Sequence, residues 1–394
     1  MMSAAGSADT PAPWDVVFFS SVDFSSHAQR AQAVARELAV LGARVLYVDN
    51  LGLRTPRFAD RERVRRRVRS ATKRRPAPTA NASALADRAP GITVLSPVVP
   101  PWRLFEPATR RWLSRRIRAW RAGDTARPLV VWTYLPNPVI AQIAETENAA
   151  ALVYEYADLA SVRLHVRSER HRQRVAAWED TMFARSTSVF VPTERLMEAR
   201  HITVKTAHVI PHGMPSVVAG TGRRVWDDEQ RWPRPRVAFV GSISPVVDIG
   251  LLDDLASSRP DWSFIVVGPA RVRVDELARH PNVLITGERD QDDVTALLAE
   301  CDVGIIPYRT TAPGIDTVSP LKLQDYLAQG LPVVSVDIPG ARGLPDDVQI
   351  AAGAQEFGDA IERAVIHGRR AAPRLRSWAA AVGEMVERVR ETVP

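Results

Sequence analysis

The chain is poor in cysteine and lysine, and it lacks long apolar runs. Cys301 is the single cysteine among 394 residues, which excludes an intrachain disulfide and fits a reducing compartment. It stands where a predicted helix meets a predicted strand, so we expect a small buried apolar residue. No run approaches the roughly 20 apolar residues that a membrane-spanning helix needs. The first residues, MMSAAGSADTPAP, do not resemble a secretory signal, and we therefore expect a cytoplasmic protein.

Several familiar catalytic motifs are absent as well. The sequence has no His/Cys cluster with metal-ligand spacing and no G-x-S-x-G nucleophile elbow. Gly220-Thr-Gly222 begins like a dinucleotide-binding fingerprint, but no predicted strand precedes it. Asp290-Gln-Asp292 looks like the metal-binding D-x-D of another transferase fold, yet acids here fit the first turn of a helix ending near Glu300. We therefore predict no protein-bound metal and no other bound cofactor.

Positive charge comes almost entirely from arginine, with 49 Arg against three Lys. One of these lysines, Lys322, lies in the most informative stretch, residues 319–335 (S-P-L-K-L-Q-D-Y-L-A-Q-G-L-P-V-V-S). Ser319 fits an N-cap and Pro320 fits the first helical position. The N–H groups of such a helix start, together with the helix dipole, favour a phosphate.

The helix that follows places Lys322 in its first turn and Asp325 one turn further along the same face. A cation at the phosphates and a carboxylate within reach of sugar hydroxyls suit a nucleotide diphosphate. Gly330 ends the helix, and a buried strand follows it. An ordinary amphipathic helix with a solvated lysine explains the same residues, and this alternative stays open.

Short apolar runs alternate with helical patterns along the chain, which is typical of parallel α/β layers. A helix is expected around 27–41, a linker over 216–235, which is rich in Gly, Pro and charge, and a helix around 375–393. The predicted strands are Val16–Ser20, Arg44–Val48, Ile92–Leu95, Leu129–Trp132, Leu152–Tyr154, Ser188–Val191, Val237–Val240, Phe264–Val267, Val283–Ile285, Val303–Ile306 and Val333–Val336.

Ligands in parallel sheets bind beyond the carboxyl ends of the strands. Gly241 and Ser242 directly follow one predicted strand, and Gly268, Gly287 and Tyr308 follow others. These loops are expected to open on the same edge as the start of the 319–335 stretch. A tight turn after a strand would explain each glycine separately. The prediction of a ligand site therefore rests on several such loops meeting at one edge of the sheet.

The stretch V-S-P-L-K-L-Q-D-Y-L-A-Q-G-L-P-V-V-S resembles the sugar-nucleotide signature of bacterial GT-B glycosyltransferases, a GT4-like group that builds cell-wall and exopolysaccharide glycans. The resemblance continues in residues 239–244 (F-V-G-S-I-S), 302–308 (D-V-G-I-I-P-Y) and 209–213 (V-I-P-H-G). It implies two facing Rossmann-like domains with a cleft between them and a C-terminal helix that packs back on the first domain. The expected boundaries are 1–215 with 372–394 for the acceptor domain, 216–235 for the linker and 236–371 for the nucleotide-sugar domain.

The resemblance also implies roles for single residues of the second domain. Gly241 and Lys322 contact the diphosphate, and Asp325 contacts the ribose of a UDP- or GDP-sugar. The family often has two carboxylates eight positions apart here, whereas this chain has Thr317 at the first place, with Asp316 beside it. The basic residue that often follows the first strand of this domain is absent too, which makes Lys322 more important.

The acceptor side offers fewer signals. Residues 153–158 (V-Y-E-Y-A-D) resemble the acidic segment of the family, and an inverting transfer needs a base for the acceptor hydroxyl. We take Asp158 as the candidate base, with His27 and then Asp23 behind it. The alternative to these catalytic roles is that Asp158 caps a helix and that His27 is a surface residue of a helix. Retention or inversion, the donor base and the acceptor do not follow from the sequence.

Two arginine-rich segments concentrate the positive charge. Residues 54–75 carry eleven Arg/Lys against two acids, and 103–121 carry seven Arg against one acid. A basic helix with aromatic residues on its apolar side fits an anionic membrane surface, which suits a lipid-linked or polysaccharide acceptor at the inner face of the plasma membrane. A solvated arginine-rich insertion remains open for 54–90, and no nucleic-acid-binding module is visible, so we expect no nucleic-acid partner. The membrane-binding candidates are Arg103, Arg110, Arg111, Trp112, Arg116 and Trp120.

Three functions fit this sequence. The first is a metal-independent hexosyltransferase that moves a sugar from a nucleotide diphosphate to a lipid-linked or polysaccharide acceptor. The second is a GT-B epimerase or phosphorylase, which is weakened because Lys322 is the only lysine placed for a phosphate-bound cofactor. The third is a non-catalytic nucleotide- or glycan-binding scaffold at the membrane, which the altered carboxylate pair favours.

Overall fold

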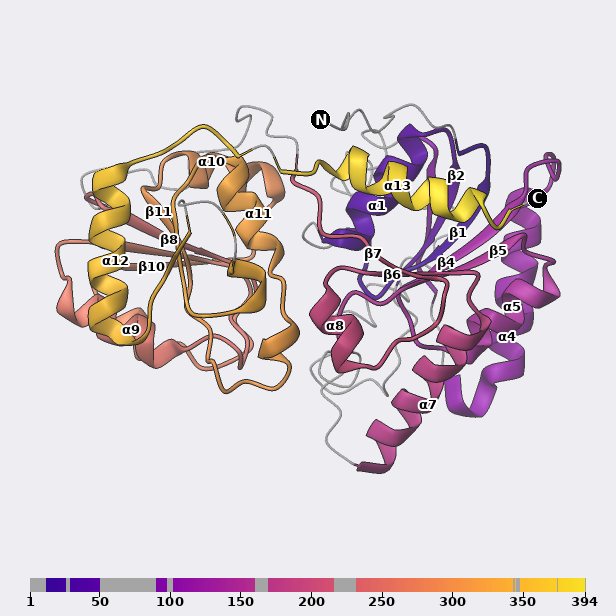
Figure 1. The fold of residues 1–394 in the computed structure, drawn as a ribbon, viewed down its shortest axis with the longest axis horizontal. Coiled ribbons are helices and arrows are strands. Elements are labelled where there is room, and N and C mark those ends of the chain that lie inside the picture. The colour runs from indigo at the N-terminus through magenta and orange to yellow at the C-terminus, as the bar shows by residue number, and fades with distance from the viewer. Residues whose placement is uncertain are drawn as a thin grey trace. The chain divides into compact units, whose positions relative to one another are not determined.

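The chain divides into two units, Met1–Pro211 with Trp378–Pro394, and His212–Ser377. The computed structural model (Figure 1) describes residues 12–25, 29–49, 90–97, 102–159, 169–215, 232–342, 344, 348–373 and 375–393, and of 102–105 the backbone alone. Part of the predicted linker, 216–231, and the first arginine-rich segment lie outside the described residues.

The first unit is built on a parallel sheet with the strand order β3-β2-β1-β4-β5-β6-β7 among the described residues. Runs such as DVVFF and LVVWT are buried over their whole length, because helices cover both faces of a parallel sheet. The strands are β1 (Asp15–Phe19), β2 (Arg44–Val48), β3 (Ile92–Leu95), β4 (Leu129–Thr133), β5 (Ala151–Glu155), β6 (Ser188–Val191) and β7 (Ala207–Val209).

Helices pack on this sheet through apolar faces. Asn137 caps α5, where its side chain accepts a hydrogen bond from the N–H of Val139, and Pro138 occupies the first helical position. The C-terminal helix α13 lies beside α1 in Figure 1, and it buries Val382, Met385, Val386 and Val389 in the core of this unit, as expected for the 375–393 segment. The helices are α1 (Arg30–Val40), α4 (Trp102–Arg121), α5 (Pro138–Thr146), α7 (Glu169–Arg185), α8 (Glu194–Ala199) and α13 (Trp378–Arg390).

The second unit repeats the plan, with the strand order β10-β9-β8-β11-β12-β13. In each sheet the order reverses beside the first strand, between β1 and β4 and between β8 and β11, and such switch points are where open α/β sheets bind ligands. The strands are β8 (Arg236–Val240), β9 (Ser263–Val267), β10 (Val283–Gly287), β11 (Val303–Ile306), β12 (Val333–Ser335) and β13 (Val348–Ile350). The helices are α9 (Ile249–Ser258), α10 (Gln291–Ala299), α11 (Leu321–Ala328) and α12 (Gly353–His367), with short 3-10 turns at Leu277–Arg279, Ile315–Thr317 and Pro339–Ala341.

The predicted strands are present within a residue or two of their expected ends, whereas two strands were not predicted. Both β7 and β13 have three residues, lie at sheet edges and are only partly buried, so they carry no apolar run for a pattern to detect. Cys301 is fully buried, and its Sγ lies 3.3 Å from the carbonyl oxygen of Leu297, which confirms the expected buried residue.

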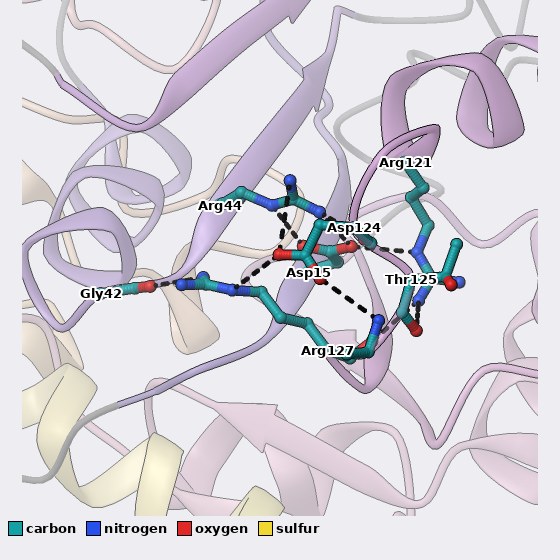
Figure 2. A network of polar contacts seen from close by, with 8 residues as sticks. Asp15, Gly42, Arg44, Arg121, Asp124, Thr125 and Arg127 are labelled. Atoms are coloured by element: carbon teal, nitrogen blue, oxygen red, sulfur yellow. Dashed lines mark hydrogen bonds and ion pairs between the residues drawn. The ribbon is translucent and has the colours of Figure 1, made fainter.

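A buried aspartate joins several elements at the amino edge of the first sheet (Figure 2). Asp15 is inaccessible to solvent at the start of β1, and it accepts two hydrogen bonds from Arg44 at 2.7 and 2.8 Å and one from Arg121 at 3.0 Å. Arg44 also donates to the carbonyl oxygen of Asp124, and Arg121 to that of Arg127. This network fastens the end of α4 to β1 and β2 at the edge opposite to the ligand-binding one.

Replacement of Asp15 by alanine should destabilise the first unit by about 1.5–3 kcal/mol, because a buried carboxylate and its hydrogen bonds to two charged arginines are lost. Asp337→Ala is the matched control. That carboxylate pairs with Arg342 in the same two-bond geometry, at 2.6 and 2.8 Å, but both side chains are more than half exposed. The control should cost less than about 1 kcal/mol. Urea unfolding of the full chain measures both, and equal losses would contradict the role given to Asp15.

Candidate functional site

The candidate site lies at the switch point of the second sheet, where β8 and β11 separate. The two strands pair at Val237 with Val303 and at Ala238 with Gly304, and no further. Beyond this point the hydroxyl of Tyr326 on α11 accepts a hydrogen bond from the N–H of Val240 at 2.8 Å. Separated parallel strands expose backbone groups, so a hydroxyl placed between them satisfies groups that would otherwise be buried without a partner.

The ring of Tyr326 packs directly on the backbone of β11. A Cβ atom at Gly304 would lie 2.6 Å from the ring, so only glycine leaves room for it. The hydroxyl also lies 3.3 Å from the carbonyl oxygen of Ala238 and 3.4 Å from that of Ile305. These contacts hold α11 under the gap between β8 and β11 and so fix where the helix begins.

Helix α11 begins one residue later than predicted. Pro320, with φ −75° and ψ 127°, is the N-cap, and Leu321 is the first helical residue, so Ser319 lies outside the helix rather than capping it. The extended ψ of Pro320 is the physical reason, since a first helical residue needs a helical ψ. Lys322 still falls in the first turn, and Gly330, with φ 64°, ends the helix as expected.

Lys322 is buried among aromatic side chains. It is 9% exposed, and its Nζ atom lies 3.8 Å from the ring centre of Phe239 on β8 and 4.9 Å from that of Tyr308 after β11. Aromatic faces attract a cation electrostatically. Burial nevertheless lowers the pKa of Lys322 to about 7, and it raises the pKa of Asp325 to about 6, while the attraction between the two opposes both shifts.

Glycines bring three loops to this lysine. Gly241 and Gly268 have φ values of 127° and 134°, which side-chain-bearing residues avoid, and they follow β8 and β9. A Cβ atom at Gly268 would lie 2.1 Å from the carbonyl oxygen of Gly241, and one at Gly241 would lie 2.9 Å from Nζ of Lys322. The N–H of Gly268 in turn donates to the carbonyl oxygen of Gly287, the last residue of β10, at 2.8 Å. The convergence expected of these loops is therefore present.

Backbone hydrogen bonds also join the neighbouring loops. The N–H of Ile243 donates to Pro269 at 3.0 Å, and that of Arg309 donates to Val246 at 2.8 Å. Ser242 is partly buried next to Gly241, and Asp248 caps α9 with a bond from the N–H of Leu251. A loop network of this kind holds a site in place before any ligand arrives.

Sequence reasoning missed two basic residues at this edge. Arg271 follows β9 and Arg309 follows β11, and both are exposed. The family resemblance points to a basic residue only in the loop after β8, where none is present. The signal for the other two is an arginine within four residues of a strand end, as in V-G-P-A-R for Arg271 and P-Y-R for Arg309. Thr317, which stands in place of a family carboxylate, is buried, and its hydroxyl donates to the carbonyl oxygen of Gly314 at 2.9 Å, whereas Asp316 is exposed.

The candidate catalytic residues belong to the first unit. Asp158 is partly buried, and its carboxylate accepts from the N–H of Leu159 at 2.8 Å, while 160–168 and His27 lie outside the described residues. Arg30, the first residue of α1, has its side chain buried in an ion pair of 2.7 Å with Glu155. That pair joins the start of α1 to the end of β5.

The predicted membrane-binding helix is α4, and its aromatic residues contribute to the fold. Leu113 and Ile117 are fully buried, and Trp112 and Trp120 pack partly buried against the same core. The guanidinium of Arg116 lies 5.4 Å from the ring centre of Trp112. Arg110 donates to Gln142 at 2.8 Å, and the side chain of Arg103 lies outside the described residues. The exposed basic residues of α4 are Arg111, Arg115, Arg116 and Arg118.

The described residues contain neither a metal-ion cluster nor a membrane-spanning helix. No group of three or more His, Cys, Asp or Glu side chains is arranged there to hold a metal ion. No helix in the same part of the chain is long and apolar enough to cross a membrane.

Part of the second unit is similar to a known protein family. Residues 234–367 match the family model of glycosyl transferases group 1. TuaH of Bacillus subtilis strain 168, whose name assigns it to teichuronic acid biosynthesis as a glycosyltransferase, is 29% identical over 224 residues, which are 53% of this chain and 55% of TuaH. The chain thus spans about half the length of this curated relative.

Solved structures are similar over nearly the whole chain. HepE of Anabaena in complex with UDP has a TM-score of 0.56 at 15% identity, over 95% of this chain and 94% of HepE. The same protein with UDP-glucose has a TM-score of 0.57 at 14% identity, over 94% of each chain. AviGT4, a glycosyltransferase involved in avilamycin A biosynthesis, has a TM-score of 0.56 at 14% identity, over 97% of this chain and 98% of AviGT4.

The similarity to these structures shows the fold of the chain: its two Rossmann-like units have the GT-B fold of glycosyltransferases. The resemblance to bacterial GT-B glycosyltransferases is therefore confirmed, and within it residues 234–367 are similar to the glycosyl transferases group 1.

The close approach of Gly268 to Gly241 should make Gly268→Ala far more costly than Gly287→Ala. Both glycines lie at the carboxyl end of a strand and have positive φ, but a Cβ atom at Gly287 would meet nothing within 4 Å. Gly287→Ala should therefore cost only backbone strain, about 1–3 kcal/mol. Gly268→Ala should cost more than this, because backbone atoms must move. Urea unfolding of the two variants compares them, and similar losses would contradict this account of the loops.

Proposed function

We propose that the protein is a glycosyltransferase whose second unit binds the diphosphate of a nucleotide-sugar donor. The observation that carries this proposal is the placement of Lys322, in the first turn of α11 and beside Gly241, at the switch point of the sheet. A helix start, a lysine and glycine loops form a phosphate site by their chemistry. Because HepE was solved with UDP and with UDP-glucose, a UDP-sugar is the donor we favour, with a GDP-sugar next.

In this proposal different residues around Lys322 bind different parts of the donor. The diphosphate lies against the start of α11 after Ser319, against Lys322 and against the backbone of Gly241 and Ser242. Asp325 binds the ribose, and Tyr308 lines the site. Arg271 and Arg309, both exposed at the same edge, supply positive charge that the loop after β8 lacks.

The chemistry needs charge stabilisation on one side and a base on the other. As the glycosidic bond breaks, negative charge grows on the leaving diphosphate, where the helix start and Lys322 stabilise it. Asp158, with His27 behind it, is our candidate for the group that takes the proton of the acceptor hydroxyl. We assign no step to a metal ion, and the transferred sugar is a hexose in this proposal.

Removal of the lysine amine should abolish most donor binding. Calorimetry with UDP, GDP, TDP and ADP should find one nucleotide that binds the wild-type protein, and Lys322→Ala should bind it about 10–100-fold more weakly, since a hydrogen bond to a charged group contributes about 1.5–3 kcal/mol. Lys205→Ala is the control, because Lys205 is exposed and lies in the other unit. Binding of no nucleotide by the folded wild-type protein would exclude a donor site.

Two further measurements extend this test: nucleotide binding as a function of pH, and turnover of the sugar donor. A bound diphosphate favours charged Lys322, so affinity should fall by up to about tenfold per pH unit as the pH rises above about 7, and binding should take up a proton. Lys322→Arg, which stays charged, should remove this slope. Turnover of the sugar form of the bound nucleotide then tests transfer itself, and an Asp158→Asn protein with full turnover would exclude Asp158 as the base.

We propose that the acceptor is a lipid-linked or polysaccharide glycan, used at the cytoplasmic face of the membrane. The exposed arginines of α4 support attachment to an anionic surface, and the name of TuaH refers to a cell-wall polymer. Because Trp112 and Trp120 pack against the core of their own unit, the attachment we propose is electrostatic and does not depend on inserted aromatic rings.

Loss of two exposed arginines of α4 should weaken membrane binding. Each basic residue near an anionic leaflet contributes about 1 kcal/mol, so Arg111→Gln with Arg115→Gln should reduce binding to phosphatidylserine vesicles about 30-fold at low salt. Arg170→Gln with Arg174→Gln on α7 is the control, since these arginines are exposed on another helix of the same unit. Equal weakening in both pairs, or no vesicle binding by the wild-type protein, would contradict α4 as the membrane surface.

A non-catalytic scaffold remains the second candidate. It is favoured by Thr317, which replaces a family carboxylate and uses its hydroxyl within the 314–317 turn. Nucleotide binding without any sugar turnover would identify this second function.

A further inference from the structure

The chain enters the second unit at His212 and leaves it at Ser377, and these two segments are paired. The N–H of Met214 donates to the carbonyl oxygen of Arg376 at 2.8 Å, and Met214 forms a parallel bridge with Ser377. Because the segment that enters this unit is hydrogen-bonded to the segment that leaves it, we expect a displacement of one segment to move the other.

His212 joins this pair of segments to the start of α11. Its Nε2 atom lies 3.2 Å from the carbonyl oxygen of Ser319, which stands directly before the N-cap Pro320. Since a carbonyl only accepts, the ring must carry a hydrogen on Nε2 to make this bond. The histidine therefore holds the peptide from which the helix begins.

The neighbouring peptide is held from another side. The N–H of Gly340 donates to the carbonyl oxygen of Val318 at 3.3 Å. A Cβ atom at Gly340 would lie 2.9 Å from Cα of Ser319 and 3.1 Å from Cδ of Pro320, so glycine is needed for this contact. Residues 318–320 are thus fixed between His212 and Gly340.

These contacts matter because Pro320 has no N–H and α11 has no side-chain cap at this residue. The direction of the first helical N–H groups, and the place of Lys322 two residues after the N-cap, depend on where residues 318–320 lie. We propose that His212 is a positioning residue for the donor diphosphate, which holds the start of α11 and connects donor binding to the segment through which the chain enters this unit. This inference rests on the proposed function of the α11 site.

Nucleotide binding to His212 variants tests the inference. With the diphosphate nucleotide that binds the wild-type protein, His212→Ala should raise Kd about three- to tenfold, as expected for loss of one neutral hydrogen bond. The affinity for the matching nucleoside should stay unchanged, because His212 acts on the phosphate side alone. His212→Gln, whose amide can donate to the carbonyl oxygen of Ser319, should recover at least half of the loss. His280→Ala is the control, since His280 is a partly buried histidine of the same unit that contacts Asp253 instead.

Hydrogen exchange gives a readout that a merely structural role would not change. In the wild-type protein, the diphosphate should slow exchange of the Met214 amide, and in His212→Ala this protection should be lost although the nucleotide still binds at saturating concentration. If His212→Ala matches the wild-type protein in both Kd and protection, the inference is wrong while the donor site stands. If the wild-type protein binds no nucleotide, the proposed function fails and the inference fails with it. His212→Gln decides the matter should the alanine variant not fold.

Discussion

The insertion of Tyr326 between β8 and β11 is the interaction on which the candidate site depends. Its hydroxyl accepts from Val240 while its ring lies on Gly304, so one side chain satisfies the backbone of two separating strands and docks α11 beneath them. Without that docking the helix start would have no defined place at the switch point. Loss of the ring would leave a cavity, and loss of the hydroxyl would leave a buried N–H without its partner, and both are costly in a packed interior.

Docking of α11 has a consequence for the charge of Lys322. The helix places the amine against Phe239 and Tyr308, where burial lowers its pKa to about 7 although the aromatic faces favour the cation. Burial makes this amine easier to deprotonate than a solvated lysine, so the diphosphate that we propose would stabilise its charged form. The position of the Lys322 amine also requires glycine at 241, because a side chain on residue 241 would point at the amine. In the donor site that we propose, affinity and its pH dependence would therefore depend on the same packing arrangement.

Buried ion pairs and close glycine contacts stabilise different parts of the two sheets. The first unit uses buried ion pairs, with Asp15 at the amino edge and Arg30–Glu155 at the other end of the sheet. Such pairs are costly to desolvate, yet they impose a definite geometry on the elements that they join. The second unit uses glycines at its carboxyl edge, where backbone approaches backbone. The edge that we propose for the donor diphosphate thus brings together glycine backbone, the start of α11 and Lys322, with Arg271 and Arg309 exposed beside them.

The sequence by itself determined the alternation of strands and helices, the helix at Lys322 and its end at Gly330, because apolar runs and special residues act over a few positions. It also indicated that the glycine loops meet, because parallel strands end on one edge. Only the tertiary structure decided that Lys322 lies in an aromatic cage, that His212 holds Ser319, and that Trp112 and Trp120 of α4 pack inward. The contact of Tyr326 with Val240 joins residues 86 positions apart. A periodic pattern shows which face of an element is apolar, but it does not name the residue that will cover that face, since this depends on how distant elements pack together.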